Sequence, residues 1–220
     1  MNFFPKTTLI KHNNIVINIK IKGGLEEPET IAKQVPYMRM FVAVDIPEGL
    51  KEKIIEIEKE IQSLADVKAT ESENLHYTLK FLGDVEEKES ENVVKKIEVI
   101  SKQFKKFKVH TKGVGFFGSP DFIKVVWTGC EEGKETLINI SKKLEEELKY
   151  IKEDEYDFHP HLTIARPRNV ENKKKFLEKL EEMKNLDFGE FIVDKIILKQ
   201  SKLSAKGPEY SDFKVFELGD

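Results

Sequence analysis

The feature that most constrains this chain is one short pattern that occurs twice, at residues 76–79 (HYTL) and 161–164 (HLTI). Each copy reads histidine, any residue, threonine, apolar residue, inside a run of aliphatic, aromatic and β-branched residues that predicts a strand. Side chains alternate between the two faces of a strand, so each histidine shares a face with its threonine. Each copy therefore places an imidazole beside a hydroxyl.

The spacing between the two copies recurs along the rest of the chain. The two histidines are 85 residues apart, and the same offset relates a succession of predicted strands and helices. The related segments are an apolar strand (41–44 and 126–129), a helix (50–64 and 135–149), a second helix (86–104 and 171–189) and a strand that begins at 107 and at 192. An internal duplication is the simplest account. It predicts two similar lobes, each contributing one histidine and one threonine to a shared cleft.

A purely structural role is the alternative for either copy alone. Threonine is a favoured strand residue, so a single histidine–threonine pair can be filler. Two pairs at the offset shared by the helices are harder to explain in that way. We therefore interpret His76, Thr78, His161 and Thr163 as one functional group.

The predicted strand at 75–83 assigns its residues to two faces. Alternation places Tyr77, Leu79 and Phe81 against a helix, and leaves Lys80 beside the motif on the cleft face. In the second copy Pro160 precedes the motif, so that strand starts there or lies at an edge. Late strands are predicted at 191–198 and 214–218, and a polar, basic loop at 199–210 that could line the mouth of the cleft.

Residues 1–37 lie outside the 85-residue repeat. Apolar and polar residues alternate at 15–21, which suits an amphipathic strand, and two glycines then break the pattern. The segment shows neither a signal peptide pattern nor a membrane span. We interpret 1–37 as an appended tail, disordered or the result of a start codon assigned upstream of a true start near Met38, and 38–220 as a two-lobed domain.

Charge and cysteine content narrow the class of protein. The 37 basic and 40 acidic side chains leave a net charge of −3, so no global basic excess indicates tight nucleic-acid binding. A small or single-stranded nucleic acid in a locally basic cleft remains compatible. The single cysteine, Cys130, cannot form an internal disulfide, which fits a reducing compartment, and its position predicts a buried thiol at a strand end.

Three further residues have competing interpretations. His110 stands alone, and we expect it on a strand surface or satisfied in the core. Phe116 and Phe117 could stack on a base, but core packing is the better expectation.

Two histidines and two threonines without a matching carboxylate limit the chemistry. His159 and His161 could offer two metal ligands, but zinc sites draw on three or four, and the first motif has no second histidine or cysteine nearby. No nucleophile turn and no phosphate-binding glycine loop is present. Paired imidazoles can instead act as base and acid around one phosphorus, with threonine hydroxyls on its oxygens. Arg166 and Lys80 could add charged contacts. The residues alone leave open which histidine is the acid.

The motifs resemble those of the two-histidine phosphoesterases. Phe81, Leu82 and Gly83 follow the first motif and Arg166 follows the second, as in that superfamily. The run at 38–47 (MRMFVAVDIP) and the tail residues Ser201, Leu203, Gly207 and Tyr210 resemble the LigT-like branch, the RNA 2′,3′-cyclic phosphodiesterases also called 2′-5′ RNA ligases. The likeness covers about 38–218.

This resemblance implies a fold and an activity. The fold is α+β and bilobal, with two antiparallel sheets facing a central cleft and helices on the outside. The activity is metal-independent opening of an RNA 2′,3′-cyclic phosphate to a 2′-phosphomonoester, with no cofactor. His76 would protonate the leaving 3′-oxygen, His161 would activate water, and Thr78, Thr163 and Arg166 would hold the phosphate.

The resemblance also supplies candidate contacts, partners and alternatives. Lys80 and Tyr210 are candidate substrate contacts. The expected partner is an RNA with a cyclic phosphate end, tRNA-derived RNA among the candidates, or a small cyclic nucleotide, handled by a cytoplasmic monomer that does not bind membranes. Reversible 2′-5′ RNA ligation at the same site is one alternative. A module that binds RNA ends or nucleotides without turnover is another, although such a module would not need two titrating groups.

Overall fold

The structure is a computed structural model that describes residues 36–154, 158–204 and 207–219, together with the backbone of three short strands nearer the amino terminus. These are β1 (Thr7–His12), β2 (Ile15–Lys20) and β3 (Lys33–Gln34), and they form a three-stranded sheet of their own. The strand expected at 15–21 is confirmed for Ile15–Lys20, and residue 21 lies outside the described residues. The interpretation of 1–37 as an appended tail stays a prediction.

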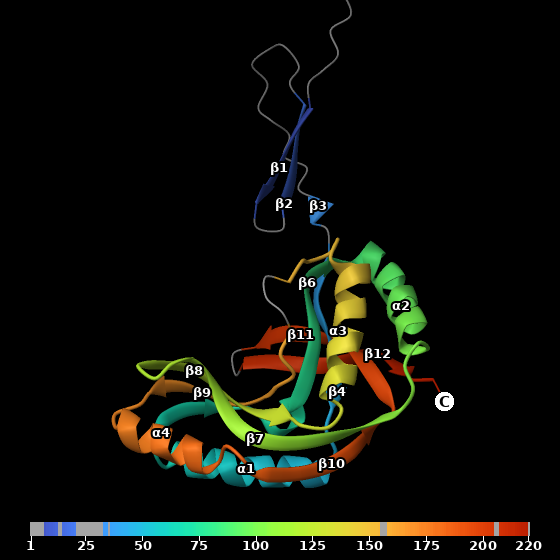
Figure 1. Cartoon of the computed structure of the whole chain (residues 1–220). Coiled ribbons are helices and arrows are strands. Elements are labelled where there is room, and N and C mark those ends of the chain that lie inside the picture. The colour runs from blue at the N-terminus through green and yellow to red at the C-terminus, as the bar shows by residue number, and fades with distance from the viewer. Residues whose placement is uncertain are drawn as a thin grey trace, which may run out of the picture.

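The main body is a curled antiparallel sheet of nine strands with helices on its outside (Figure 1). The strands are β4 (Tyr37–Asp45), β5 (Asp66–Ala69), β6 (His76–Glu86), β7 (Phe107–Ser119), β8 (Phe122–Cys130), β9 (Leu162–Asn169), β10 (Asp187–Val193), β11 (Lys195–Ser204) and β12 (Gly207–Glu217). The helices are α1 (Glu48–Gln62), α2 (Glu87–Ser101), α3 (Lys134–Leu148) and α4 (Lys173–Glu182), with a 3₁₀ turn η1 (Ser72–Asn74). None of the helices in the described part of the chain combines the length and apolar character needed to cross a bilayer.

The sheet consists of two halves that meet at one point. Its order is β10-β7-β8-β9-β6-β4-β11-β12, with β5 paired to β9, and the central β6–β9 junction is a single residue pair, Tyr77 and Leu162. The expected α+β fold is confirmed, with one correction: the two expected sheets are halves of one sheet. The chain crosses from one half to the other at Asp194, so the single strand expected at 191–198 is in fact the end of β10 and the start of β11.

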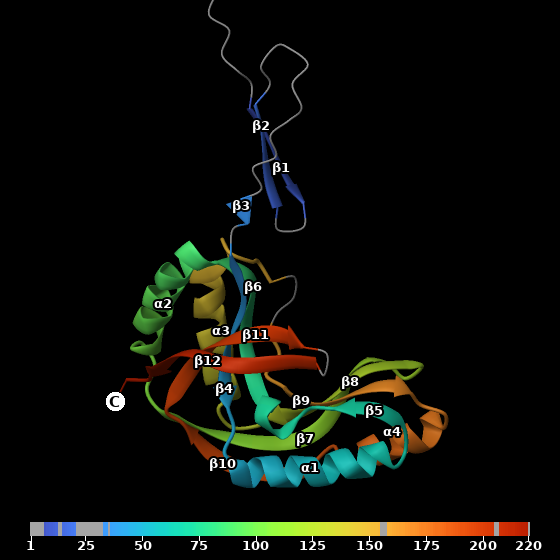
Figure 2. The ribbon, with the colours of Figure 1, turned by 180° about the vertical axis from the view of Figure 1, so that it is seen from behind.

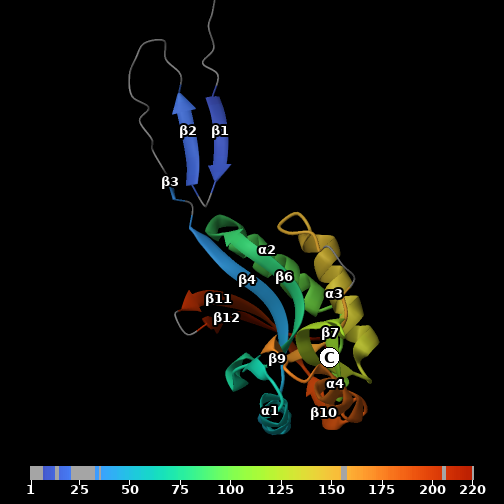
Figure 3. The ribbon, with the colours of Figure 1, turned by 90° about the vertical axis from the view of Figure 1, so that its left-hand side faces the viewer.

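The repeats exchange elements between the halves. At the 85-residue offset β4 corresponds to β8, β6 to β9 and β7 to β11, yet β7 pairs with β8 and β11 pairs with β4. The helices follow the same exchange: α2 and α3 cover one half, and α1 and α4 cover the other (Figures 2 and 3). Each half-sheet therefore needs strands from both repeats, and neither repeat could satisfy its edges alone.

Apolar stripes explain why the helices form and which face they bury. In α3, Leu137, Ile140, Leu144 and Leu148 recur at helical spacing and are all fully buried. The same spacing operates in the other helices, as the sequence predicts. One position in the α1 stripe breaks the rule, because it holds a carboxyl group.

The buried carboxyl of Glu58 should make stability depend on pH. Its side chain is 5% exposed, Oε1 has no partner in the described structure, and burial, helped by the nearby Glu71, raises its pKa to about 7. The folded protein then keeps a proton that the unfolded chain loses above its pKa of 4.5. The free energy of unfolding should therefore fall as pH rises from about 4.5 to about 7, by roughly 2 kcal/mol.

Urea unfolding at pH 5 and pH 8 would measure this dependence. Glu58→Gln should remove most of the decline, while Glu56→Gln, at an exposed position of the same helix, should keep it. An equal decline in both variants would assign the pH dependence to another group.

Candidate active site

The two motifs meet in one cavity of about 350 Å³ between the half-sheets. Its residues come from the central strands β6 and β9, from the β5–η1 connection, and from the start of β12. The lining consists of Lys68, Ala69, Thr70, Glu71, Asn74, His76, Thr78, Phe81, His161, Thr163, Arg166, Pro208 and Tyr210. The shared cleft expected from the repeat is thus present in the fold. It brings together both histidines, both threonines and Arg166.

His76 lies deep in this cavity, between aromatic rings. Its Nε2 is 2.9 Å from Thr78 Oγ1, and the ring also hydrogen-bonds to the backbone of Asn74. Phe41 packs 5.0 Å from it, and Tyr210 meets it edge-on at 5.6 Å between ring centroids. Burial lowers the pKa of His76 to about 4. His76 is therefore neutral near pH 7 when no phosphate is bound in the cavity.

His161 is held in one orientation by the backbone just before it. Its Nδ1 lies 2.7 Å from the carbonyl oxygen of His159, so Nδ1–H donates that bond. A neutral His161 then carries its lone pair on Nε2. Phe117 meets the ring edge-on at 4.8 Å between centroids. Burial lowers the pKa of His161 as well, and the hydrogen bond to His159 acts in the opposite direction.

The charges around the two rings differ in sign. Asp45, the cross-strand partner of His76, favours the protonated form of that ring and outweighs the opposing charge of Lys199. Arg166 instead favours the neutral form of His161. Both pKa values would rise when a phosphate anion enters the cavity. The charged neighbours thus act in opposite directions on the two rings, while burial, the largest influence on each, lowers both pKa values.

A β-bulge after each motif decides which later side chains reach the cavity. The extra residues are Leu79 on β6 and Ile164 on β9, each directly after the threonine of its motif. A bulge shifts the alternation of side chains by one residue. Phe81 and Arg166, which are equivalent in the repeat, are thereby turned into the cavity. One half of the site thus offers an aromatic ring where the other offers a cation.

The same bulge overturns two expectations for β6. Lys80 was expected in the cleft, but it is 2% exposed and its Nζ pairs with Glu145 of α3 and, at 3.0 Å, with Asp154. That expectation is wrong, because the extra residue turns Lys80 toward the helix. Phe81 was expected against the helix, yet it is 54% exposed and lines the cavity.

The carboxyl-terminal segment is also more ordered than its polar sequence indicates. The loop expected at 199–210 is a β-hairpin, in which β11 continues to Ser204 and β12 starts at Gly207. Lys199 is buried between Asp45 and Asp212, at 2.9 and 2.7 Å. Tyr210 lines the cavity, as the candidate contact was expected to do. The sequence analysis did not predict that the segment from β5 to η1 (residues 68–74) lines the cavity, because this segment carries no recognisable motif.

Of the other singled-out residues, His110 and Phe116 take their expected places, Cys130 ends its strand but is only half-buried, and Phe117 lies beside the catalytic cavity and not in the core. His110 is satisfied by Asp187 at 2.9 Å and Glu131 at 3.3 Å. Cys130 ends β8, and burial raises its pKa to about 12. Phe116 packs against the core, whereas Phe117 contacts His161 and Trp127. Within the residues described, no three histidine, cysteine or carboxylate side chains are grouped as a metal ion would require.

Comparison with known proteins gives a consistent picture. The family model described as LigT like Phosphoesterase matches residues 44–127 and 129–210. Proteins named RNA 2′,3′-cyclic phosphodiesterase are similar along most of the chain. The protein from Methanothermobacter thermautotrophicus is 37% identical over 82% of this chain and 99% of its own, and that from Archaeoglobus fulgidus is 38% identical over 82% and 100%.

Solved structures share the fold at lower identity. The protein TT0787 of Thermus thermophilus superposes with a TM-score of 0.71 at 24% identity, over 83% of this chain and all of that one. E. coli LigT complexed with 3′-AMP gives a TM-score of 0.68 at 21% identity, over 84% of this chain and all of that one.

Proposed function

The chain belongs to the LigT-like phosphoesterase family, and we propose that its two-histidine cavity opens 2′,3′-cyclic phosphates at RNA ends to 2′-phosphomonoesters. The observation that carries this proposal is the meeting of both motifs in one cavity, with two hydroxyls and a guanidinium beside two imidazoles. The relatives named RNA 2′,3′-cyclic phosphodiesterase support the same substrate. The substrate would be an RNA end, with tRNA-derived RNA and small cyclic nucleotides as candidates.

The proposed reaction is a single in-line displacement at phosphorus. His161 Nε2 takes a proton from water, and the water oxygen forms a new bond to phosphorus. The bond from phosphorus to the ribose 3′-oxygen breaks, and His76 donates a proton to that oxygen. The product carries a 2′-phosphomonoester and a free 3′-hydroxyl. Acid and base assistance of this kind each contribute about 10²–10⁴-fold.

The other cavity residues would act on the phosphate and the nucleoside. Thr78 and Thr163 donate hydrogen bonds to the non-bridging oxygens, where charge develops in the transition state. Arg166 adds a charge-assisted contact from the same side as His161. Phe81 and Tyr210 offer ring faces and edges to the terminal base. No step needs a metal or cofactor, because the two imidazoles supply both proton transfers.

A product assay would test the reaction and its metal independence together. A short RNA ending in a 2′,3′-cyclic phosphate is incubated in EDTA, and the product is compared with 2′- and 3′-phosphate standards by chromatography. A 2′-phosphate is the expected product. A 3′-phosphate would contradict the assignment of the leaving oxygen. Activity that EDTA abolishes and zinc restores would contradict metal independence. We expect a monomer to suffice, since one chain completes the cavity, and the lone cysteine suits the cytoplasm.

Arg166→Ala is expected to lower kcat/KM by about 10²-fold, the usual loss when one donor to a developing oxyanion is removed. Arg166→Lys should recover part of the loss, because it restores charge without the paired geometry. Arg168→Ala is the matched control, since Arg168 is exposed two residues further along β9 and does not line the cavity. Equal losses in both arginine variants would show that general positive charge, and not a contact in the cavity, is what matters.

The pH profile should differ between the free protein and the complex. Burial lowers the pKa of both histidines, that of His76 to about 4, and kcat/KM reports the free protein. Its bell-shaped optimum should therefore lie below pH 6.5. The profile of kcat should be displaced to higher pH, because the bound phosphate anion raises both pKa values. Steady-state rates from pH 4 to pH 9 would measure both curves, and coincident optima near pH 8 would contradict the burial argument.

A further inference from the structure

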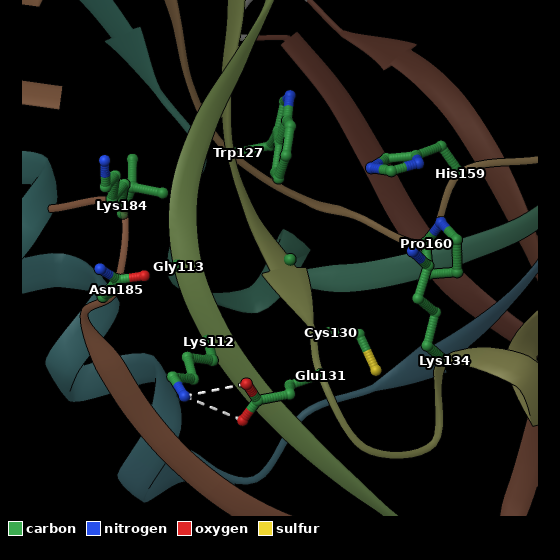
Figure 4. A pocket seen from close by; sticks show the side chains of 12 residues that line it. Lys112, Gly113, Trp127, Cys130, Glu131, Lys134, His159, Pro160, Lys184 and Asn185 are labelled. Carbon is green, nitrogen blue, oxygen red and sulfur yellow. Dashed lines mark hydrogen bonds and ion pairs between the residues drawn. The ribbon is translucent and has the colours of Figure 1, made fainter. Parts of the chain in front are cut away.

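A second cavity of about 460 Å³ lies beside the catalytic one and has no part in the reaction described above (Figure 4). Trp127, His159 and Lys134 line it, together with Lys112 and Glu131, which pair with each other at 2.9 and 3.0 Å. Figure 4 shows Trp127 and His159 on one side of Cys130, with Lys134 rising beside Pro160. The cavity thus combines aromatic rings with a cation.

This cavity opens on the same face of the sheet as the catalytic groups. Trp127 is the cross-strand partner of Thr163, and such partners place their side chains on one face. Phe117 contacts His161 at 4.8 Å and Trp127 at 5.3 Å between centroids, and His159 lies 5.4 Å from Trp127. Aromatic rings therefore run without interruption from the catalytic histidine into the second cavity. His159 also holds His161 through its carbonyl.

The indole of Trp127 packs against two glycines. A Cβ at Gly115, its cross-strand neighbour on β7, would stand 2.6 Å from two carbons of the ring, and a Cβ at Gly129 would stand 3.4 Å from another. Any larger side chain at Gly115 would displace the indole. Backbone thus packs closely against the indole and holds it in place.

Three lysines line the cavity, Lys112, Lys134 and Lys184, and the first and last of them are paired with carboxylates, which leaves Lys134. It is the first residue of α3, and its charge helps to lower the pKa of His159, which places it close to that ring. No ion pair of Lys134 is formed with any residue that the structure describes. Lys112, by contrast, is already neutralised by Glu131. Lys134 is therefore available to an anion.

The chemistry of the substrate determines what could enter this cavity. A 2′,3′-cyclic phosphate closes the 3′ end of an RNA, so the rest of the strand is attached through the 5′-oxygen of the terminal ribose. Only a nucleotide on that side can reach a neighbouring cavity. We propose that the second cavity binds the penultimate nucleotide of the RNA, with its base on Trp127 and the linking phosphate near Lys134. This inference rests on the proposed function and extends it, since it makes oligoribonucleotides the preferred substrate class.

The first test uses the fluorescence of Trp127, the only tryptophan in the chain. Binding is titrated with the catalytically disabled His76→Ala variant. This variant is chosen because His76 lies on β6, whereas Trp127 lies on β8. A dinucleotide ending in a cyclic phosphate should quench the fluorescence and bind about tenfold more tightly than the mononucleotide, a typical gain from stacking one base. A dinucleotide with an abasic 5′ residue should lose that gain. Equal affinities with no quenching would overturn the inference.

Kinetics supply a second and separable readout. The ratio of kcat/KM for the dinucleotide to that for the mononucleotide should be about ten in the native chain and should fall toward one in Trp127→Leu and partly in Lys134→Ala. Lys142→Ala, at an exposed position further along α3, should keep the native ratio. Losses of equal size on both substrates would show that Trp127 only supports His161, and would overturn the subsite. Quenching without any turnover would refute the proposed hydrolysis while leaving the subsite supported.

Discussion

Replacing His76 or His161 with alanine is expected to lower kcat by about 10³-fold in each case, because each variant loses one of the two proton transfers. The double variant should be little worse than either single one, since groups that act together in one step give non-additive losses. Rates on an RNA with a 2′,3′-cyclic phosphate end would measure all three. Retention of more than a tenth of the native rate in either single variant would remove that histidine from the mechanism.

A histidine outside the cavity provides the control. His110→Ala should leave kcat unchanged, since His110 pairs with Asp187 and Glu131 away from the cavity. Thermal melts of each variant separate lost chemistry from lost folding. Removing His76 also removes its contact with Thr78, so a shift of a few degrees would not by itself explain a 10³-fold loss.

The assignment of donor and acceptor needs a different substrate. A nucleoside 2′-(4-nitrophenyl phosphate) expels nitrophenolate, which needs no proton on leaving. If His76 is the acid, His76→Ala should recover most of its activity on this ester, whereas His161→Ala should remain impaired. Recovery in His161→Ala instead would reverse the two roles. The Asp45 and Arg166 charges favour the first outcome.

What the sequence could predict depends on whether the information is local. The helical stripes and the two motifs are local patterns. The structure confirms the helices and brings the motifs together, but the helix expected at 171–189 ends at Glu182, and residues 187–189 belong to β10. The exchange of β7 and β11 between the halves cannot be predicted locally, because the residues of a strand do not determine which other strand it pairs with. The contribution of the segment from β5 to η1 to the cavity was not predicted, because it too depends on strand pairing.

The bulges show the limit most clearly. Strict alternation assigns Lys80 to the face of Thr78, but assigns Arg166, three residues after Thr163, to the face away from it. Arg166 was nevertheless proposed as a charged contact in the site together with Lys80, although strict alternation places only Lys80 on the face of its threonine. One extra residue after each threonine resolves this conflict, since it turns Arg166 in and Lys80 out. A one-residue bulge is defined by the pairing between two strands, so it cannot be predicted reliably from the sequence of one strand.

Lys80 therefore becomes a test of that geometry. Lys80→Ala is expected to lower the free energy of unfolding by about 3 kcal/mol, because it leaves Glu145 and Asp154 without their buried cation. The estimate stands at the low end of the usual range, since both carboxylates retain about 30% exposure and some water. Lys96→Ala is the matched control: Lys96 pairs with Glu147 on the same helix but at the surface, so its loss should cost less than about 1 kcal/mol.

The two accounts of Lys80 differ in what the variant should do to catalysis. A cleft lysine would raise KM or lower kcat at any temperature, with little effect on stability. A lysine buried behind the bulge should weaken folding strongly, and kcat/KM measured well below the melting temperature should stay within about threefold of the native value. Urea unfolding and steady-state rates on the same preparations decide between them. A stable but inactive Lys80→Ala would mean that the side chain faces substrate after all, and would refute the orientation that the bulge at Leu79 gives to Lys80.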